Sequence, residues 1–185
     1  MLKLNSLFLK SILLFIFFGS MTGMKAQNVY STTNGAIFIK GIINDSAIVA
    51  RSHELTILLD YETAEFSIKL DVSSLSTGVE SWDDKIKNLK DKYILLKGKL
   101  GLNSINTEKH PPLNFTVKAY VLSNNDDDKS IDGDGSLIHV FGDNYSCVLN
   151  LNFKFDWKEA GLNIDIPGLK NEMQVKIIQT VLVQK

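Results

Sequence analysis

The residue types that most often carry chemistry are few in this chain and lie far apart. Its three histidines are His53, His110 and His139, and none has a second ligand at a metal-binding spacing such as H-x-x-x-H. The single cysteine, Cys147, cannot form an internal disulfide. It falls inside an alternating apolar run, which predicts a buried thiol with a raised pKa and low reactivity. The sequence therefore points away from a metal centre and from thiol catalysis.

Other catalytic motifs give the same result. The chain has no G-x-S-x-G nucleophile turn, no G-x-G-x-x-G and no P-loop. Residues 128–136 place Asp, Ser and Gly at several positions of an EF-hand loop, but His139 stands where a bidentate Glu is needed. We expect this segment to be an acidic, solvated hairpin loop. The sequence predicts no catalytic residue, no metal, no cofactor and no enzymatic activity.

Charge and composition narrow the class of protein. The 185 residues include 20 Lys and Arg against 21 Asp and Glu, giving a net charge of −1. A balanced charge offers no clustered cations for phosphates, so no nucleic-acid partner is expected. With 44% hydrophobic and 22% charged residues, the composition is that of a folded domain and not of a disordered chain.

The first 26 residues differ from the rest of the chain. Lys3 and Lys10 form a basic start, residues 11–18 are almost entirely apolar, and Ala26 offers a small residue before a cleavage site. This pattern predicts a signal peptide at 1–26, a domain at 27–185, and a periplasmic or secreted location. The alternative is an uncleaved anchor, although the apolar run is shorter than the roughly 20 residues that span a bilayer. No later segment is long enough, so no stable span is expected after cleavage.

The remaining chain alternates apolar and polar residues with a period of two, which is typical of strands with one buried face. The clearest runs are 66–72 and 145–157. Turn residues such as Asn44-Asp45 and Pro167-Gly168 separate the segments. Further strands are predicted at 36–43, 46–52, 54–60, 113–122, 136–141 and 172–183.

One segment follows a helical period instead. Trp82, Ile86, Leu89 and Tyr93 are spaced by four, three and four residues, which places them on one face of a helix. Ser81 stands where an N-cap residue is expected. The sequence therefore predicts an all-β fold with one short amphipathic helix between two strands.

About eight antiparallel strands must protect their edges. Closing into a barrel does so, and an eight-stranded barrel either fills its interior with side chains or holds one small ligand. A two-layer sandwich is the competing architecture. The long predicted strands favour a barrel, with the apolar faces of its strands turned inward and the predicted helix over an opening. The side chains expected to line the lumen are Phe66, Ile68, Leu70, Trp82, Ile86, Leu89, Phe115, Val117, Leu149, Leu151 and Phe153.

Several short motifs resemble those of the YceI-like family of exported lipid-binding barrels. Residues 66–78 read F-S-I-K-L-D-V-S-S-L-S-T-G, an alternating strand that runs into a turn and then into a charged helical crossover. Residues 109–115, K-H-P-P-L-N-F, are similar to the family's step into a later strand. Gly135, Leu137 and His139 fit a further strand motif, although Val140 replaces the glycine expected after the histidine.

This resemblance implies an extended, lipocalin-like, eight-stranded antiparallel barrel that holds a long isoprenoid-like or fatty chain and has no enzymatic role. It makes Arg51, the only arginine, and His139 candidates for a polar rim that holds a headgroup. Two functions stay open from the sequence: a lipid carrier or sequestering protein, and a structural or protein-interaction domain with a filled core. A homodimer is an open alternative to a monomer.

Overall fold

The computed structural model describes residues 28–89, 92–106, 111–121, 129–140, 146–159, 162 and 164–185. Within these residues the chain forms eight strands, one α-helix and one short 3₁₀ helix. In chain order the elements are β1 (Val29–Ile43), β2 (Ser46–Asp60), β3 (Glu65–Asp71), η1 (Val72–Ser74), α2 (Glu80–Lys87), β4 (Tyr93–Leu100), β5 (Leu113–Val121), β6 (Lys129–Val140), β7 (Ser146–Asp156) and β8 (Glu172–Gln184).

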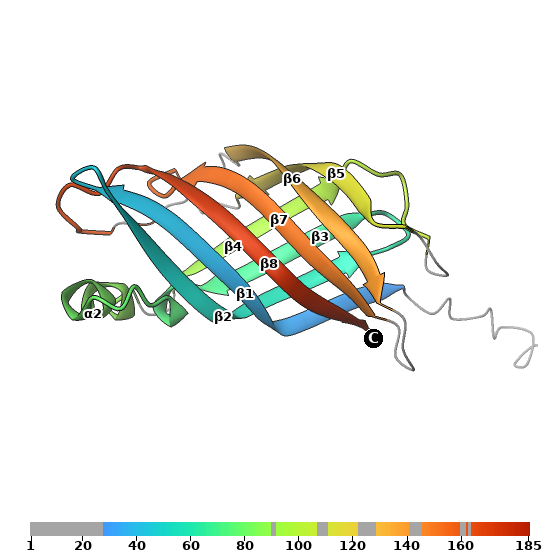
Figure 1. Cartoon of the computed structure of the whole chain (residues 1–185), viewed down its shortest axis with the longest axis horizontal. Helices are drawn as coiled ribbons and strands as arrows, with labels where there is room; N and C mark the ends of the chain where they lie inside the picture. Colours follow the sequence, from blue (N-terminus) through green and yellow to red (C-terminus); the bar gives the residue numbers. More distant parts are fainter. Residues whose placement is uncertain are drawn as a thin grey trace, which may run out of the picture.

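The eight strands form one closed antiparallel barrel (Figure 1). Each strand pairs with the next along the chain, and β8 closes the sheet on β1 with Val175 opposite Ile39 and Gln184 opposite Tyr30. Full closure removes the exposed edges that an open sheet would have to protect. The predicted barrel is therefore confirmed, and the competing sandwich is excluded.

Alternation of side chains decides which face of each strand is buried. On β7 every second residue from Cys147 to Phe155 is buried, while the residues between them are partly or fully exposed. β3 and β5 show the same period. Since the inward positions are nearly all apolar, burying them is the main contribution to the stability of the fold.

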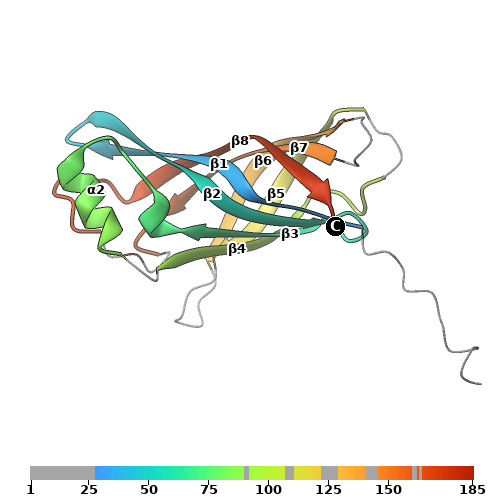
Figure 2. The same ribbon diagram turned by 90° about the horizontal axis from the view of Figure 1, so that it is seen from below.

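The barrel has two different ends (Figure 2). We call one end the mouth: it carries the β1–β2 turn, η1, α2 and the segment 157–171 between β7 and β8. The opposite end, which we call the closed end, carries the β2–β3 turn at residues 61–64 and the last residues of β8. The mouth and the closed end are described separately below because their side chains differ.

Several predicted strand boundaries were wrong. Segments 46–52 and 54–60 are one continuous strand, β2. β1 begins at Val29, well before residue 36, and it contains a register shift around Gly35. β4 was not predicted as a strand, because its first residue, Tyr93, completed the helical spacing.

The helix and the acidic segment also differ from expectation. Helix α2 ends at Lys87, so Leu89 and Tyr93 lie beyond it. Its N-cap is Val79 and not Ser81. The described part of the predicted acidic loop, from Lys129 onward, is the first half of strand β6, where Asp132 and Asp134 are exposed on the outer face.

The predicted signal peptide at 1–26 lies outside the described residues, as do His110 and Asp128, the first residue of the predicted acidic loop. Among the residues that the structure describes, no helix has the length and apolar character needed to cross a bilayer.

Candidate functional site

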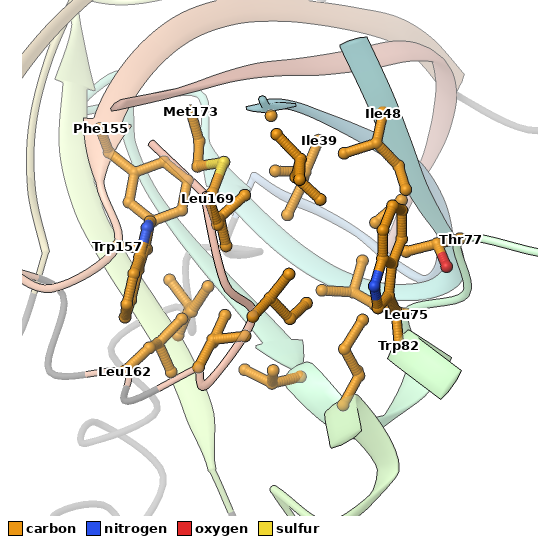
Figure 3. A pocket seen from close by; sticks show the side chains of 18 residues that line it. Ile39, Ile48, Leu75, Thr77, Trp82, Phe155, Trp157, Leu162, Leu169 and Met173 are labelled. Carbon is orange, nitrogen blue, oxygen red and sulfur yellow. The ribbon is translucent and has the colours of Figure 1, made fainter. Parts of the chain in front are cut away.

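The mouth of the barrel contains an apolar pocket with a cavity volume of about 70 Å³ (Figure 3). Its walls come from the ends of the strands nearest the mouth, from η1 and α2, and from the segment between β7 and β8. Thr77 carries the only hydroxyl among the lining residues. The 18 lining residues are Ile39, Gly41, Ile43, Ile48, Ala50, Val72, Leu75, Thr77, Trp82, Ile86, Ile94, Phe155, Trp157, Leu162, Ile164, Ile166, Leu169 and Met173.

Both tryptophans of the chain lie in this pocket, on opposite sides of it (Figure 3). Trp157 is buried, and its indole Nε1 donates a hydrogen bond to the carbonyl oxygen of Lys170 at 3.1 Å. That bond fixes the ring against the segment that follows β7. Trp82, on α2, is only partly buried. The pocket therefore has one rigid and one more accessible aromatic wall.

A turn ahead of α2 fixes the position of the helix. The Asp83 carboxylate accepts hydrogen bonds from the Thr77 amide at 2.7 Å, from the Thr77 hydroxyl at 2.6 Å, from the Ser76 hydroxyl at 2.9 Å and from the Gly78 amide at 3.2 Å. Gly78 has a φ of 78°, which favours glycine. Ser76 also pairs with Arg51 of β2 through two backbone bonds of 2.9 Å. The helix is thus attached to the barrel wall.

The electrostatics of Asp83 follow from these contacts. Desolvation alone would raise the pKa of the carboxyl group, but the hydrogen bonds from Thr77, Ser76 and Gly78 outweigh it and lower the pKa to about 2. Asp83 is therefore ionised at every pH at which the protein is expected to work, and its bonds to the turn persist over that range.

Polar contacts across the mouth hold the segment 164–171 in place. The Lys85 ammonium of α2 donates to the carbonyl oxygen of Asp165 and lies 3.7 Å from its carboxylate. Lys170 lies 3.1 Å from the Asp45 carboxylate in the β1–β2 turn, and its amide donates to the Ile42 carbonyl oxygen at 2.9 Å. The segment is therefore fastened to the helix on one side and to the hairpin on the other.

Below the mouth pocket the lumen narrows. A second apolar cavity of about 20 Å³ lies between Ile37, Leu96, Phe153 and residues of the neighbouring strands. Ile39, Ile94 and Phe155 line both cavities, so the two spaces are neighbours along the barrel axis. Both cavities are thus lined by apolar side chains, but the lower cavity is much smaller than the mouth pocket.

The closed end is filled by aromatic and polar side chains. Tyr30 and Tyr61, each fully buried, stack with ring centroids 4.0 Å apart. His139 meets both rings edge-on, at 6.2 and 6.3 Å. Burial and then the neighbouring Cys147 thiol raise the pKa of the Tyr61 phenol far above its ordinary value, and burial raises the pKa of Cys147 to about 11. The Tyr61 phenol and the Cys147 thiol therefore stay neutral near pH 7, which is compatible with their burial in a packed end of the barrel.

The predicted lumen residues occupy four different environments. Trp82 and Ile86 line the mouth pocket, and Ile68, Leu70 and Phe153 line the narrower cavity. Leu89 is partly buried and packs against the core from the end of the helical segment. The others are buried among inward-facing strand residues closer to the closed end: Phe66, Phe115, Val117, Leu149 and Leu151. Whether any of them contacts a ligand stays a prediction.

The two predicted rim residues are not together at the mouth. Arg51 is exposed on the outer face of β2, where its backbone pairs with Ser76. His139 is 6% exposed and lies at the closed end against Tyr30 and Tyr61. The expectation that His139 stands at a solvated rim is corrected by this position: it follows Leu137 by two residues on β6 and therefore points inward.

Sequence reasoning missed the described residues between β7 and β8 (157–159, 162 and 164–171) as a wall of the pocket. Leu162, Ile164 and Ile166 alternate with polar residues, yet they form no strand, and Leu169 forms only a single bridge to Ile43. The alternation was a usable signal that the segment has an apolar side. Where that side packs depends on contacts with α2 and the β1–β2 hairpin. A local sequence pattern does not predict such contacts.

Comparison with known proteins identifies the fold. No family model matches the chain, and no curated protein matches it in sequence. Among solved structures it is similar to a polyisoprenoid-binding domain from Saccharophagus degradans implicated in plant cell wall breakdown, with a TM-score of 0.64 and 7% sequence identity. The match covers 86% of this chain and 99% of that domain. The barrel fold expected from the resemblance to the YceI-like family is thus confirmed.

Proposed function

We propose that this protein binds the apolar chain of an isoprenoid-like lipid at the mouth of its barrel, as a carrier or sequestering protein without enzymatic activity. The observation that carries the proposal is the mouth pocket, whose lining is apolar except for Thr77. The likeness to a polyisoprenoid-binding domain supports it, since that domain shares the barrel fold.

The physical basis is burial of the ligand's methylene groups. Each CH₂ transferred from water to an apolar site contributes about 0.8 kcal/mol. Ordering the chain and closing the mouth around it remove part of that gain. A pocket with apolar walls selects for apolar length, whereas a headgroup would lie among the few polar groups of the rim, near Thr77 and Lys85.

The proposed location is the periplasm or the exterior of the cell. The predicted signal peptide at 1–26 supports export. A carrier there would shield an apolar chain from water between membranes or enzymes. No cofactor or nucleic-acid partner forms part of this proposal.

The test uses two neighbouring residues of β2 that face opposite ways. Ala50 lines the mouth pocket, while Val49 is 45% exposed on the outer face. The chain and its Ala50→Phe and Val49→Phe variants would be purified from their native host without detergent and extracted with organic solvent for mass spectrometry. We expect an apolar compound in near-stoichiometric amount with wild type and Val49→Phe, and a strongly reduced amount with Ala50→Phe.

Stability measurements distinguish a blocked pocket from an unfolded barrel. Equal unfolding midpoints for the two variants would show that Ala50→Phe blocks the site and does not unfold the barrel. A ligand-free wild-type protein that also fails to bind a fluorescent prenyl probe would refute the proposal.

An alternative function is a protein-interaction domain that assembles as a homodimer. The observation that favours it is a group of apolar side chains on the outer face of β6 and β8: Ile138, Val181 and Val183 are 41%, 50% and 44% exposed. Val148 lies opposite both Ile138 and Val181 in the strand register. Sedimentation analysis of wild type and Val181→Lys tests it: a dimer that the substitution dissociates would support this function, and a monomer would contradict it.

A further inference from the structure

The space inside the barrel limits the length of an apolar chain that can bind there. The mouth pocket has a volume of about 70 Å³ and the lower cavity a volume of about 20 Å³. Since roughly 10 to 15 Å³ holds one water-sized group, they accommodate about seven water-sized groups, and fewer methylene groups, as the side chains now stand. A lipid with several isoprene units is much longer than this space.

The strand geometry gives a second estimate of depth. On β1 the pocket walls extend from Ile43 at the mouth to Ile37, which lines the lower cavity. Six residues at about 3.3 Å each, on strands tilted by roughly 40°, give a depth of about 15 Å along the barrel axis. An extended alkyl chain advances roughly 1.25 Å per carbon, given C–C bonds of about 1.5 Å. The lined depth therefore corresponds to about ten to twelve carbons, and a chain of that length enters only if the lining side chains move apart from their present positions.

Below the lower cavity, bulky side chains pack against glycines. Phe115 and Leu151 lie opposite Gly135 from the strands on either side of β6. A Cβ added at Gly135 would lie 2.7 Å from the Phe115 ring and 2.8 Å from the Leu151 side chain. Phe153, which lines the cavity, lies opposite Gly133 in the same way. The glycines leave room that these side chains occupy, and Phe115 and Leu151 are 7% and 2% exposed.

We propose that Phe115 and Leu151, packed over Gly135, form a floor that limits the lumen to an apolar chain of about ten carbons; the remainder of a longer lipid stays outside the mouth. This inference rests on the proposed function and adds the length of chain that the site recognises. Below the floor, the stacked Tyr30 and Tyr61 fill the closed end, so the described residues leave no second opening there for a threaded chain.

The experiment measures affinity against chain length for linear primary alcohols of about six to about sixteen carbons. Binding is followed by the emission of Trp82 and Trp157, which both line the pocket, and checked by calorimetry. We expect the affinity of wild type to rise by up to about fourfold per added carbon and to level off near ten carbons. An affinity that keeps rising to about sixteen carbons would overturn the floor while leaving lipid binding intact.

A variant with a matched control tests the residues. Phe115→Leu shortens a floor residue, while Phe38→Leu makes the same change at a partly exposed residue between the inward-facing Ile37 and Ile39 of β1. We expect the plateau to move by about two carbons, at roughly 1.25 Å per carbon, in Phe115→Leu only. An unchanged plateau in a folded Phe115→Leu would overturn the assignment of the floor. If that variant does not fold, the wild-type series still decides, and absence of binding by every alcohol would refute the proposed function itself.

Discussion

The two ends of this barrel are built from the same alternating strands but differ in what fills them. At the mouth the strands are joined by α2 and the segment 157–171, and an apolar cavity lies between them. At the closed end the strands enclose a Tyr30–Tyr61 stack with His139 against both rings. Alternating strands are therefore sufficient to form the barrel, whereas the connections at one end and the aromatic side chains at the other decide which end contains a cavity.

The difference in packing predicts a difference in response to mutation. Side chains of the closed end are fully buried and contribute mainly to stability. Some side chains of the mouth pocket, such as Trp82, Ile164 and Ile166, are only partly buried, so their removal should affect ligand binding more than folding. The following substitutions test this contrast, beginning with the largest expected effect.

Truncating the aromatic stack at the closed end should lower the free energy of unfolding the most. Tyr61→Ala removes a fully buried ring that stacks on Tyr30, and we expect the free energy of unfolding to fall by about 3 to 5 kcal/mol. Trp82→Ala at the mouth, where the ring is only partly buried, should cost less than about 2 kcal/mol while weakening ligand affinity. Urea denaturation measures both. Equal losses would contradict the contrast between the two ends.

Removing the Asp83 charge, which holds α2 in place, should loosen the mouth without affecting the packing of Tyr30 and Tyr61 at the closed end. Asp83→Asn weakens the four hydrogen bonds to the turn at 76–78 and should cost about 1 to 2 kcal/mol. Because the pKa of Asp83 is lowered from 3.8 to about 2, its contribution is complete above pH 3.8 and is lost as the pH falls through about 2.

The pH dependence of stability checks this assignment. The difference in unfolding free energy between wild type and Asp83→Asn should be constant from pH 7 to pH 4 and should shrink only at lower pH. A difference that disappears near pH 5 would show that the carboxylate is not held as described.

Breaking the contact across the mouth should change rates more than stability. Lys85→Met removes the bonds from α2 to Asp165, which are exposed and worth less than about 1 kcal/mol. We expect faster uptake and release of a fluorescent prenyl probe in stopped-flow measurements. Lys154→Met, which breaks the Lys154–Glu172 pair on the outer wall, is the matched control and should leave both rates unchanged.

The smallest effect is expected from the hydroxyl group of Tyr61. The Tyr61 hydroxyl has no hydrogen-bond partner of good geometry among the described residues, although it neighbours the Cys147 thiol. Since an unsatisfied buried hydroxyl does not stabilise the folded state, Tyr61→Phe should lie within about 1 kcal/mol of wild type. Thermal unfolding measures this. A loss of more than about 2 kcal/mol would indicate a polar role for the group.

The sequence predicted the all-β fold because several of its strands alternate cleanly. β7 and β3 bury every second residue, and their apolar types leave no ambiguity about the inward face. The first half of β6 was missed for a physical reason. Its inward positions 133 and 135 are glycines, which carry no hydrophobic signal, and its outward positions include Asp132 and Asp134. The sequence of this part of β6, in which glycines leave room for neighbouring side chains, therefore resembles that of an acidic turn.

The site was less predictable than the fold. β4 begins Tyr-Ile-Leu-Leu, and its outward Tyr93 and Leu95 remain 43% and 39% exposed, so apolar residues on both faces hid its alternation. The wall formed by Trp157, Leu162 and residues 164–171 depends on contacts such as Lys85 with Asp165, which join positions far apart in the chain. Local patterns could identify an apolar interior but not which part of it stays open.

The most direct test of the account is methyl-resolved NMR of the protein titrated with decan-1-ol. If an apolar chain enters only at the mouth, the methyl signals of Ile39, Ile86 and Ile166 will shift and saturate, because these residues line the pocket. The signals of Leu55, Leu137 and Leu182, which are fully buried outside both cavities, will stay in place. Shifts of similar size in the second set, or none in the first, would contradict the central claim.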